Sequence, residues 1–282
     1  MDKFEAIEDE IEQADILIKA AEKWSPQYKK DPKSQAKLIR FEAKLERILR
    51  KYFRDLSERV PAYVNWSAYA GFVQAFDVDV LIDDEDLDYE DGLVFNLLYD
   101  DYAKGIAIGA DAGEVIYKRP IGISETSAAV QRAAREQVAM LVGKKVDKSG
   151  RVVDNPRADY QISNKTRQDI RESINTSLSL GETIESAKIR LSKTINNPKR
   201  AEIIAQTESV NAYQIGLKTF GEESGAVGKE WLSLNDDDEC GDNANAGIID
   251  LNDSFPSGDK EPAAHPRCRC SLRLVYPEEI NQ

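Results

Sequence analysis

Histidine and cysteine are scarce in this sequence of 282 residues, which holds one histidine, three cysteines and two methionines. It also lacks an apolar run long enough to cross a bilayer, and its first residues show no basic segment followed by an apolar one. We therefore expect no membrane span and no secretory signal peptide. In a protein made in a reducing cytoplasm, cysteines are more often thiols or metal ligands than disulfides.

Several sequence motifs of catalysis are missing as well. We find no glycine-rich phosphate loop, no nucleophile elbow, and no Ser-His-Asp arrangement that avoids the single histidine, His265. Acidic residues are abundant, but nothing in their spacing selects two of them as a catalytic pair. We therefore expect a protein that is not an enzyme, and we assign no catalytic and no cofactor-binding residues.

Charge is distributed unevenly along the chain, whose net charge is −13. The stretch from Asp77 to Asp101 holds eleven acidic residues and no basic ones, whereas Lys29 to Arg59 holds eleven basic and five acidic residues. The overall acidity argues against a protein whose whole surface binds nucleic acid. Both runs fit solvated helix faces, and the basic run also fits a helix that meets an acidic partner or phosphate.

Hydrophobic periodicity predicts a mainly α protein, with long helices in the N-terminal and middle regions and a small, turn-rich α+β module at the C-terminus. The clearest helix starts at Gln35 and is limited by Pro61. One apolar stripe marks it, made of Leu38, Phe41, Leu45, Ile48, Tyr52 and Leu56. Further helices are expected at about 88–109 and 124–143, and a small hairpin around Ser149 and Gly150. We divide the chain into an N-terminal arm (1–34), a helical domain (35–160) and a C-terminal domain (161–282).

Helix caps are the sharpest local signals in the second half of the chain. Ser163 and Thr183 are predicted N-caps, and Gly181 stands where a left-handed helix stop is expected. Asn197 precedes Pro198, an order typical of an N-cap followed by the first helical residue.

The stretch "HPRCRC" contains the single histidine and two of the three cysteines: His265, Cys268 and Cys270. Zinc sites in proteins usually have four thiolate or imidazole ligands, and Cys240 can supply the fourth. The loop between Cys240 and His265 has little apolar content, which a bound metal would compensate. The spacing therefore fits a structural zinc held by Cys240, His265, Cys268 and Cys270.

Other interpretations of this cluster stay open. The cysteines also fit a disulfide anchor, a catalytic Cys268–His265 pair, or small buried side chains beside an exposed histidine. Asn243 stands where a second cysteine of a zinc knuckle would be expected. The nearby acidic run "DDDEC" fits a solvated turn, because it lacks the glycine and the final glutamate of a calcium loop.

The order of these segments resembles the Mu F-like head-morphogenesis family, the minor capsid proteins of tailed bacteriophages. The shared features are a helix with a Thr-Glu pair (Thr207 and Glu208), a strand with Trp231, an Asp-rich turn with Cys240, and the His-Pro-x-Cys-Arg-Cys signature. The resemblance covers about residues 162–276. Two positions depart from the family pattern, Gln206 in place of arginine and Asn243 in place of a second cysteine. The second departure leaves the four residues named above as the expected ligand set.

The resemblance implies a function in assembly of the virion. We expect a minor capsid protein in the capsid interior or at the portal vertex, assembled in the host cytoplasm. Its implied partners are the portal protein, the major capsid protein and packaged DNA, and it would assist head assembly and DNA packaging or delivery.

Two other classes of function remain as alternatives. One is a metal-dependent nuclease or transferase that uses the acidic turn around Asp237. The other is a zinc-stabilised nucleic-acid adaptor that uses the basic helix from Lys37 to Arg54.

Overall fold

Long helices dominate the computed structural model of the chain, which describes residues 13–14, 16–71, 81–155, 162–234 and 237–280. The long helices lie in the N-terminal and middle regions, a small two-stranded sheet interrupts them, and a small three-stranded antiparallel sheet follows near the C-terminus, so the predicted fold class is confirmed. None of the helices in these ranges combines the length and the apolar character that a membrane crossing requires.

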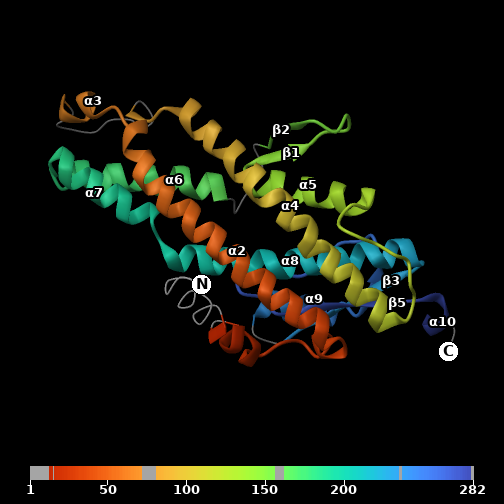
Figure 1. Cartoon of the computed structure of the whole chain (residues 1–282). Coiled ribbons are helices and arrows are strands. Elements are labelled where there is room, and N and C mark those ends of the chain that lie inside the picture. Colours follow the sequence, from red (N-terminus) through yellow and green to blue (C-terminus); the bar gives the residue numbers. More distant parts are fainter. Residues whose placement is uncertain (1–12, 15, 72–80, 156–161, 235–236, 281–282) are drawn as a thin grey trace, which may run out of the picture. The chain divides into compact units, whose positions relative to one another are not determined.

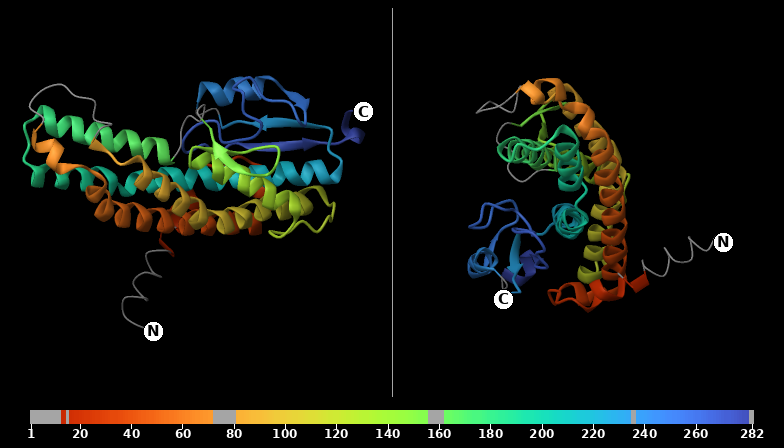
Figure 2. Two further views of the ribbon diagram at one scale, coloured as in Figure 1. Left: turned by 90° about the horizontal axis from the view of Figure 1, so that it is seen from above. Right: turned by 90° about the vertical axis from the view of Figure 1, so that its left-hand side faces the viewer.

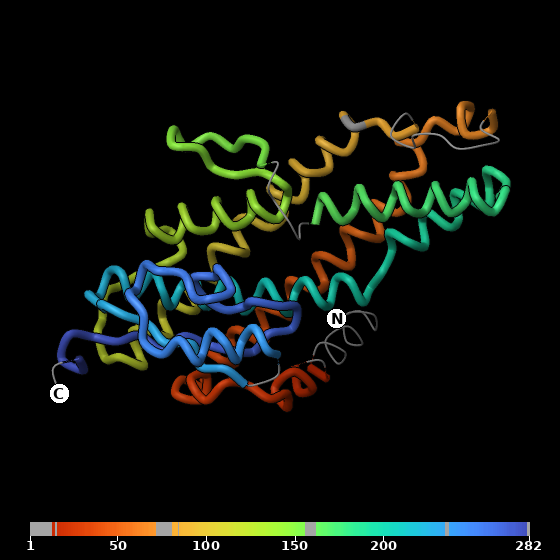
Figure 3. The backbone as a smooth tube through the Cα atoms, turned by 180° about the vertical axis from the view of Figure 1, so that it is seen from behind, coloured from red at the N-terminus to blue at the C-terminus, as the bar shows by residue number. Residues whose placement is uncertain are grey.

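The elements are drawn in Figure 1 and traced from behind in Figure 3. The α-helices are α2 (Pro32–Arg59), α3 (Trp66–Gly71), α4 (Asp84–Tyr117), α5 (Ala128–Leu141), α6 (Ile162–Ser179), α7 (Ile184–Ile195), α8 (Pro198–Ser224), α9 (Asp238–Asn245) and α10 (Pro277–Ile280). The 3-10 helices are η1 (Tyr28–Lys30) and η2 (Val60–Tyr63). The strands are β1 (Lys144–Val146), β2 (Val152–Asp154), β3 (Gly228–Leu232), β4 (Ile248–Asp250) and β5 (Ser271–Val275).

The chain folds into two compact units, each assembled from separate segments of sequence. Unit 1 comprises Met1–Glu46, Asp101–Ala134 and Ile203–Gln282, and unit 2 comprises Arg47–Asp100 and Arg135–Glu202. These units follow contacts rather than sequence order. The division at residues 34 and 160 therefore stays a prediction.

The three-stranded sheet of unit 1 has the order β4-β3-β5, and both pairings are antiparallel. Trp231 of β3 pairs with Leu272 of β5, and both residues are buried. The helix α9 lies on one face of the sheet and the C-terminal part of α8 on the other (Figure 2). Helices on both faces explain why β5 is apolar along most of its length.

Glycines bring α4 and α8 into close contact in unit 1. A Cβ atom added at Gly109 of α4 would lie 1.8 Å from the backbone oxygen of Tyr213, and one added at Gly216 of α8 would lie 1.9 Å from that of Ile106. Only a residue without a side chain fits at either position. This packing explains why α4 continues to Tyr117, beyond the end expected at 109, although its sequence there is rich in small residues.

The apolar stripe of α2 is buried as predicted at Leu38, Phe41, Leu45, Tyr52 and Leu56, whereas Ile48 is half-buried. The opposite charges of the basic and acidic runs pair within the chain. In unit 1, Lys44 Nζ lies 2.6 Å from Asp101, and in unit 2 Arg59 Nε lies 2.7 Å from Glu90. Asp77 and Asp79 of the acidic run lie outside the described residues.

Most of the predicted caps in unit 2 are present. Thr183 accepts a hydrogen bond from Ser186 N at the start of α7, Gly181 has a φ of 63°, and Asn197 accepts one from Lys199 N at the start of α8. The prediction for Ser163 is wrong, because α6 begins at Ile162 and places this serine inside the helix. The predicted hairpin is confirmed as the β1–β2 pair.

Replacing Gly109 with alanine should destabilise the protein, because the new methyl group would overlap the backbone of α8. We expect the free energy of unfolding to fall by about 3 kcal/mol or more. Gly92 lies in the same helix and has nothing within 4 Å of an added Cβ, so Gly92→Ala is the matched control. That change should raise the free energy of unfolding by up to about 1 kcal/mol. Urea unfolding of both variants measures the difference, and equal effects would contradict the close contact.

Candidate metal centre

Three buried cysteines meet beside the sheet of unit 1. Cys240 lies in the first turn of α9, whereas Cys268 and Cys270 lie immediately before β5. Their sulfur atoms all lie within 4.8 Å of one another, and those of Cys240 and Cys268 are 3.7 Å apart. All three are free thiols with no exposed surface. Three of the four predicted site residues therefore come together.

The cluster has the donor atoms and the spacing that a soft metal ion requires. Two sulfurs bound to one tetrahedral zinc at about 2.3 Å lie about 3.8 Å apart, close to the observed separation. The pKa of Cys270 is lowered, because the thiols of Cys240 and Cys268 donate hydrogen bonds to it and the backbone N–H of Leu234 adds another. The pKa of Cys240 is raised by the same hydrogen bonds and by burial. The three buried cysteines could bind a metal ion such as zinc.

The fourth predicted residue, His265, is not among the residues whose ligand atoms meet within 4.8 Å. Its Nδ1 lies 2.9 Å from the carbonyl oxygen of Pro266. Because a carbonyl oxygen can only accept, Nδ1 is the donor in this contact, and in the neutral ring Nε2 then carries the lone pair. This Nε2 is buried and has no hydrogen-bond partner among the described residues.

The turn from His265 to Cys268 directs the chain into the cluster. Cys268 N donates to His265 O at 3.2 Å, Pro266 takes the second position, and Arg267 takes the third with a φ of 65°. This is a type II turn, in which the third position normally holds glycine. Arg267 N donates to the hydroxyl of Thr207 at 3.2 Å, and this bond helps to hold the arginine in the left-handed region.

Two polar residues near the cluster serve the local fold. Asp237 is the N-cap of α9 and accepts a hydrogen bond from Glu239 N at 2.9 Å. Asn243, at the position of the expected second cysteine, is fully buried. It donates to Ser257 Oγ at 2.9 Å and accepts from Ser257 N at 3.0 Å. Asn243 therefore fixes the loop after β4.

Arg269, between the two cysteines, points into a buried network of charges. Its Nη1 lies 2.6 Å from Glu42 of α2, and its Nη2 lies 2.6 Å from Glu22. The guanidinium also lies 4.0 Å from the ring centre of Trp24. Lys19 completes the network, with its Nζ 2.9 Å from Glu42. Sequence reasoning missed this network, although an acid within the apolar stripe of α2 was a usable signal.

Side chains also satisfy the outer edge of β5, which no strand within the described ranges covers. Tyr28 donates to the oxygen of Cys270 at 3.0 Å, Leu272 N donates to Gln214 at 3.0 Å, and Leu274 N donates to Tyr117 at 2.7 Å. An edge paired in this way is closed to a further strand. These contacts hold the backbone that carries the cysteines against α4 and α8.

The helix α8 contacts the segment before β5 through Thr207, one of the residues that carried the family resemblance, and through Gln206, which departs from the family pattern. Gln206, in the amide orientation that satisfies both of its polar atoms, accepts from Arg269 Nη2 at 3.0 Å. Thr207 accepts from Arg267, as described above. Glu208 accepts from the hydroxyl of Tyr102 at 2.8 Å. The helix α8 and the signature before β5 are therefore in direct contact.

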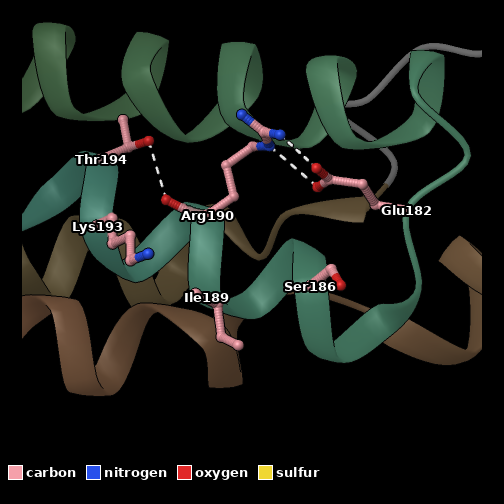
Figure 4. A pocket seen from close by; sticks show the side chains of 6 residues that line it. All are labelled: Glu182, Ser186, Ile189, Arg190, Lys193 and Thr194. Carbon is pink, nitrogen blue, oxygen red and sulfur yellow. Dashed lines mark hydrogen bonds and ion pairs between the residues drawn. The ribbon is translucent and has the colours of Figure 1, made fainter.

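A hollow of about 430 Å³ lies on α7 in unit 2 and is drawn in Figure 4. It is lined by Glu182, Ser186, Ile189, Arg190, Lys193 and Thr194. Arg190 is already paired with Glu182, and Thr194 donates to the backbone oxygen of Arg190 at 3.0 Å. The hollow contains none of the predicted site residues, and we assign it no function.

Removing the charge of Arg269 should destabilise the fold, because Glu42 would keep a buried carboxylate with one partner fewer. For Arg269→Met we expect a loss of about 3–5 kcal/mol in the free energy of unfolding. Arg273, in β5, forms part-exposed ion pairs with Glu230 and Glu279, so Arg273→Met should cost about 1 kcal/mol or less. Similar losses for the two variants would contradict a special role of Arg269.

The same pair should make stability sensitive to acid. Burial alone would raise the pKa of Glu42, but the hydrogen bonds and charges of Arg269 and Lys19 outweigh it and lower the pKa. This contribution to stability is fully present above the ordinary carboxyl pKa of 4.5 and is lost as the pH falls through the lowered value. The free energy of unfolding, measured by urea denaturation at a series of pH values, should therefore decrease more steeply below pH 4.5 for the native protein than for Arg269→Met.

No protein-family model matches this sequence, and neither a curated protein nor a solved structure matches it.

Proposed function

We propose that this chain is a minor head-morphogenesis protein of a tailed bacteriophage. One observation carries the proposal. Two of the parts that resemble the Mu F-like family, the Thr-Glu pair of α8 and the signature before β5, are far apart in sequence, yet Arg267 N donates to the hydroxyl of Thr207 across 60 positions. Contacts of this kind are expected if the parts are the core of one inherited module and not a chance order of short matches.

The proposed protein acts by binding other proteins. It enters the assembling head in few copies, associates with the portal or the major capsid protein, and assists DNA packaging or delivery. The basic residues of α2 support the nucleic-acid adaptor less well, because Lys37 and Lys44 are paired with acids of α4 at 3.0 and 2.6 Å. The alternative of a metal-dependent nuclease or transferase is supported less well, because the side chain of Asp237 caps α9.

We further propose that the module holds one structural zinc ion through Cys240, Cys268, Cys270 and His265. Histidines that bind metals usually donate their second ring N–H to a backbone carbonyl or a carboxylate. His265 has this arrangement, with Nδ1 bound to Pro266 O and the lone pair of Nε2 free. A shift of the turn from His265 to Cys268 would complete the ligand set, and the ion would tie α9 to the start of β5.

Particles purified from the producing host should contain the protein at low stoichiometry. Quantitative mass spectrometry with isotope-labelled peptides measures its copies relative to the major capsid protein. Particles assembled without the portal protein are the control, and we expect them to contain less of the chain. Its absence from both procapsids and mature heads would rule out the proposed function.

The zinc proposal is tested by elemental analysis of protein purified without chelator. We expect about one zinc ion per chain, and loss of the ion in Cys268→Ser, because a thiolate ligand is removed. His265→Ala should keep three thiolate ligands and bind zinc more weakly, as measured by competition with a chromogenic chelator. Zinc far below one per chain, with a melting temperature indifferent to chelator, would show that the cysteines only pack.

A further inference from the structure

The three cysteines are also placed for a covalent reaction that needs no metal. The sulfurs of Cys240 and Cys268 are 3.7 Å apart although no bond joins them, and both side chains are buried. The two residues are 28 positions apart in sequence and belong to different elements, α9 and the segment before β5. A disulfide would require the two sulfurs to approach to about 2.05 Å.

We infer that Cys240 and Cys268 form a disulfide bond when the metal-free chain meets a small oxidant such as a peroxide. The inference goes beyond the proposed function and does not depend on it. Three disulfide pairings are possible among the three cysteines, and we assign the bond to one of them.

The surrounding contacts select this pair among the three. Cys268 and Cys270 are separated by one residue, and a disulfide between them would close a small, strained ring. The backbone of Cys270 is held by Tyr28, which donates to its oxygen at 3.0 Å, and by the adjacent strand β5. Cys268 lies at the end of the turn that begins at His265, and its sulfur is 3.7 Å from that of Cys240.

The reaction with hydrogen peroxide balances without another reactant. One thiolate sulfur attacks the peroxide, the O–O bond breaks, and a sulfenic acid and hydroxide form. The second thiol then attacks the sulfenic sulfur, the S–S bond forms, and the oxygen leaves as water after taking up the thiol proton. Two thiols are oxidised, one peroxide is reduced to two waters, and Cys270 remains a thiol.

Such a disulfide would crosslink the same two segments as a bound metal. It would tie the first turn of α9 to the segment before β5 and close the loop that carries β4. The chain would then keep this connection in an oxidising medium, where thiolate ligands for a metal are lost.

The experiment uses the full chain, freed of metal by chelator, reduced, and then exposed to hydrogen peroxide. Because the thiols are buried, the reaction should proceed at the rate of local opening, and a time course is needed. Intact mass should fall by two hydrogen atoms, and peptide mapping after alkylation should join the peptides of Cys240 and Cys268. Cys270→Ser should form the same link, whereas Cys268→Ser should not.

Three results would overturn the inference: a link that contains Cys270, links only between two chains, or three free thiols in folded chain after prolonged oxidation. If a serine variant fails to fold, the peptide map of the native sequence decides alone. The particle measurement is separate, so failure of the disulfide leaves the proposed virion function standing, and the reverse also holds.

Discussion

The side chain of Arg269 is only 4% exposed, so its guanidinium requires a compensating negative charge. Glu42, whose side chain is 1% exposed, supplies that charge. The pair joins the segment before β5 to α2, at a separation of 227 residues. Replacing such a pair by apolar residues is often neutral, but removing one partner leaves an uncompensated charge. The position of the cysteine segment in unit 1 therefore depends on both residues being present together.

The alternation Cys-Arg-Cys lets one short segment meet two different environments. Cys268 and Cys270 turn toward Cys240 and α9, whereas Arg269 between them turns toward α2 and Trp24. Alternate residues of an extended chain point to opposite sides, so this division needs no special backbone. The charged side fixes where the segment lies, and the sulfur side can then bind a metal or form a disulfide without carrying the fold alone.

Periodic and local features of this fold were predictable from the sequence. The stripe of α2, the cap at Thr183 and the turn glycine Gly181 follow from rules that act over a few residues, and the structure has all three. The meeting of Cys240 with Cys268 was also predicted, because Cys240 was the one cysteine left to complete a four-ligand site with His265, Cys268 and Cys270.

Contacts that join distant segments were not predictable in the same way. The close packing of the glycines of α4 depends on α8, and the burial of Glu42 in α2 depends on Arg269, which is 227 residues away. The orientation of His265 likewise depends on a turn whose third residue is an arginine with positive φ. Local propensity cannot encode such contacts, because the partner residue decides them.

The loop between β4 and β5 is held by few apolar contacts, so a bond between the cysteines would add to its stability. Polar contacts hold it at intervals: Asn243 binds Ser257, Lys229 donates to Lys260 O at 2.7 Å, and Asn211 accepts from Ala263 N at 2.6 Å. Each such bond adds about 1 kcal/mol net, and only Leu251 and Phe255 anchor the first part of the loop in the core. The loop is thus fixed by several weak contacts, and Cys240 in α9, before β4, meets Cys268 and Cys270 at the end of the loop. A metal or a disulfide at that point would tie α9 directly to the segment before β5, which the weak contacts of the loop do not do.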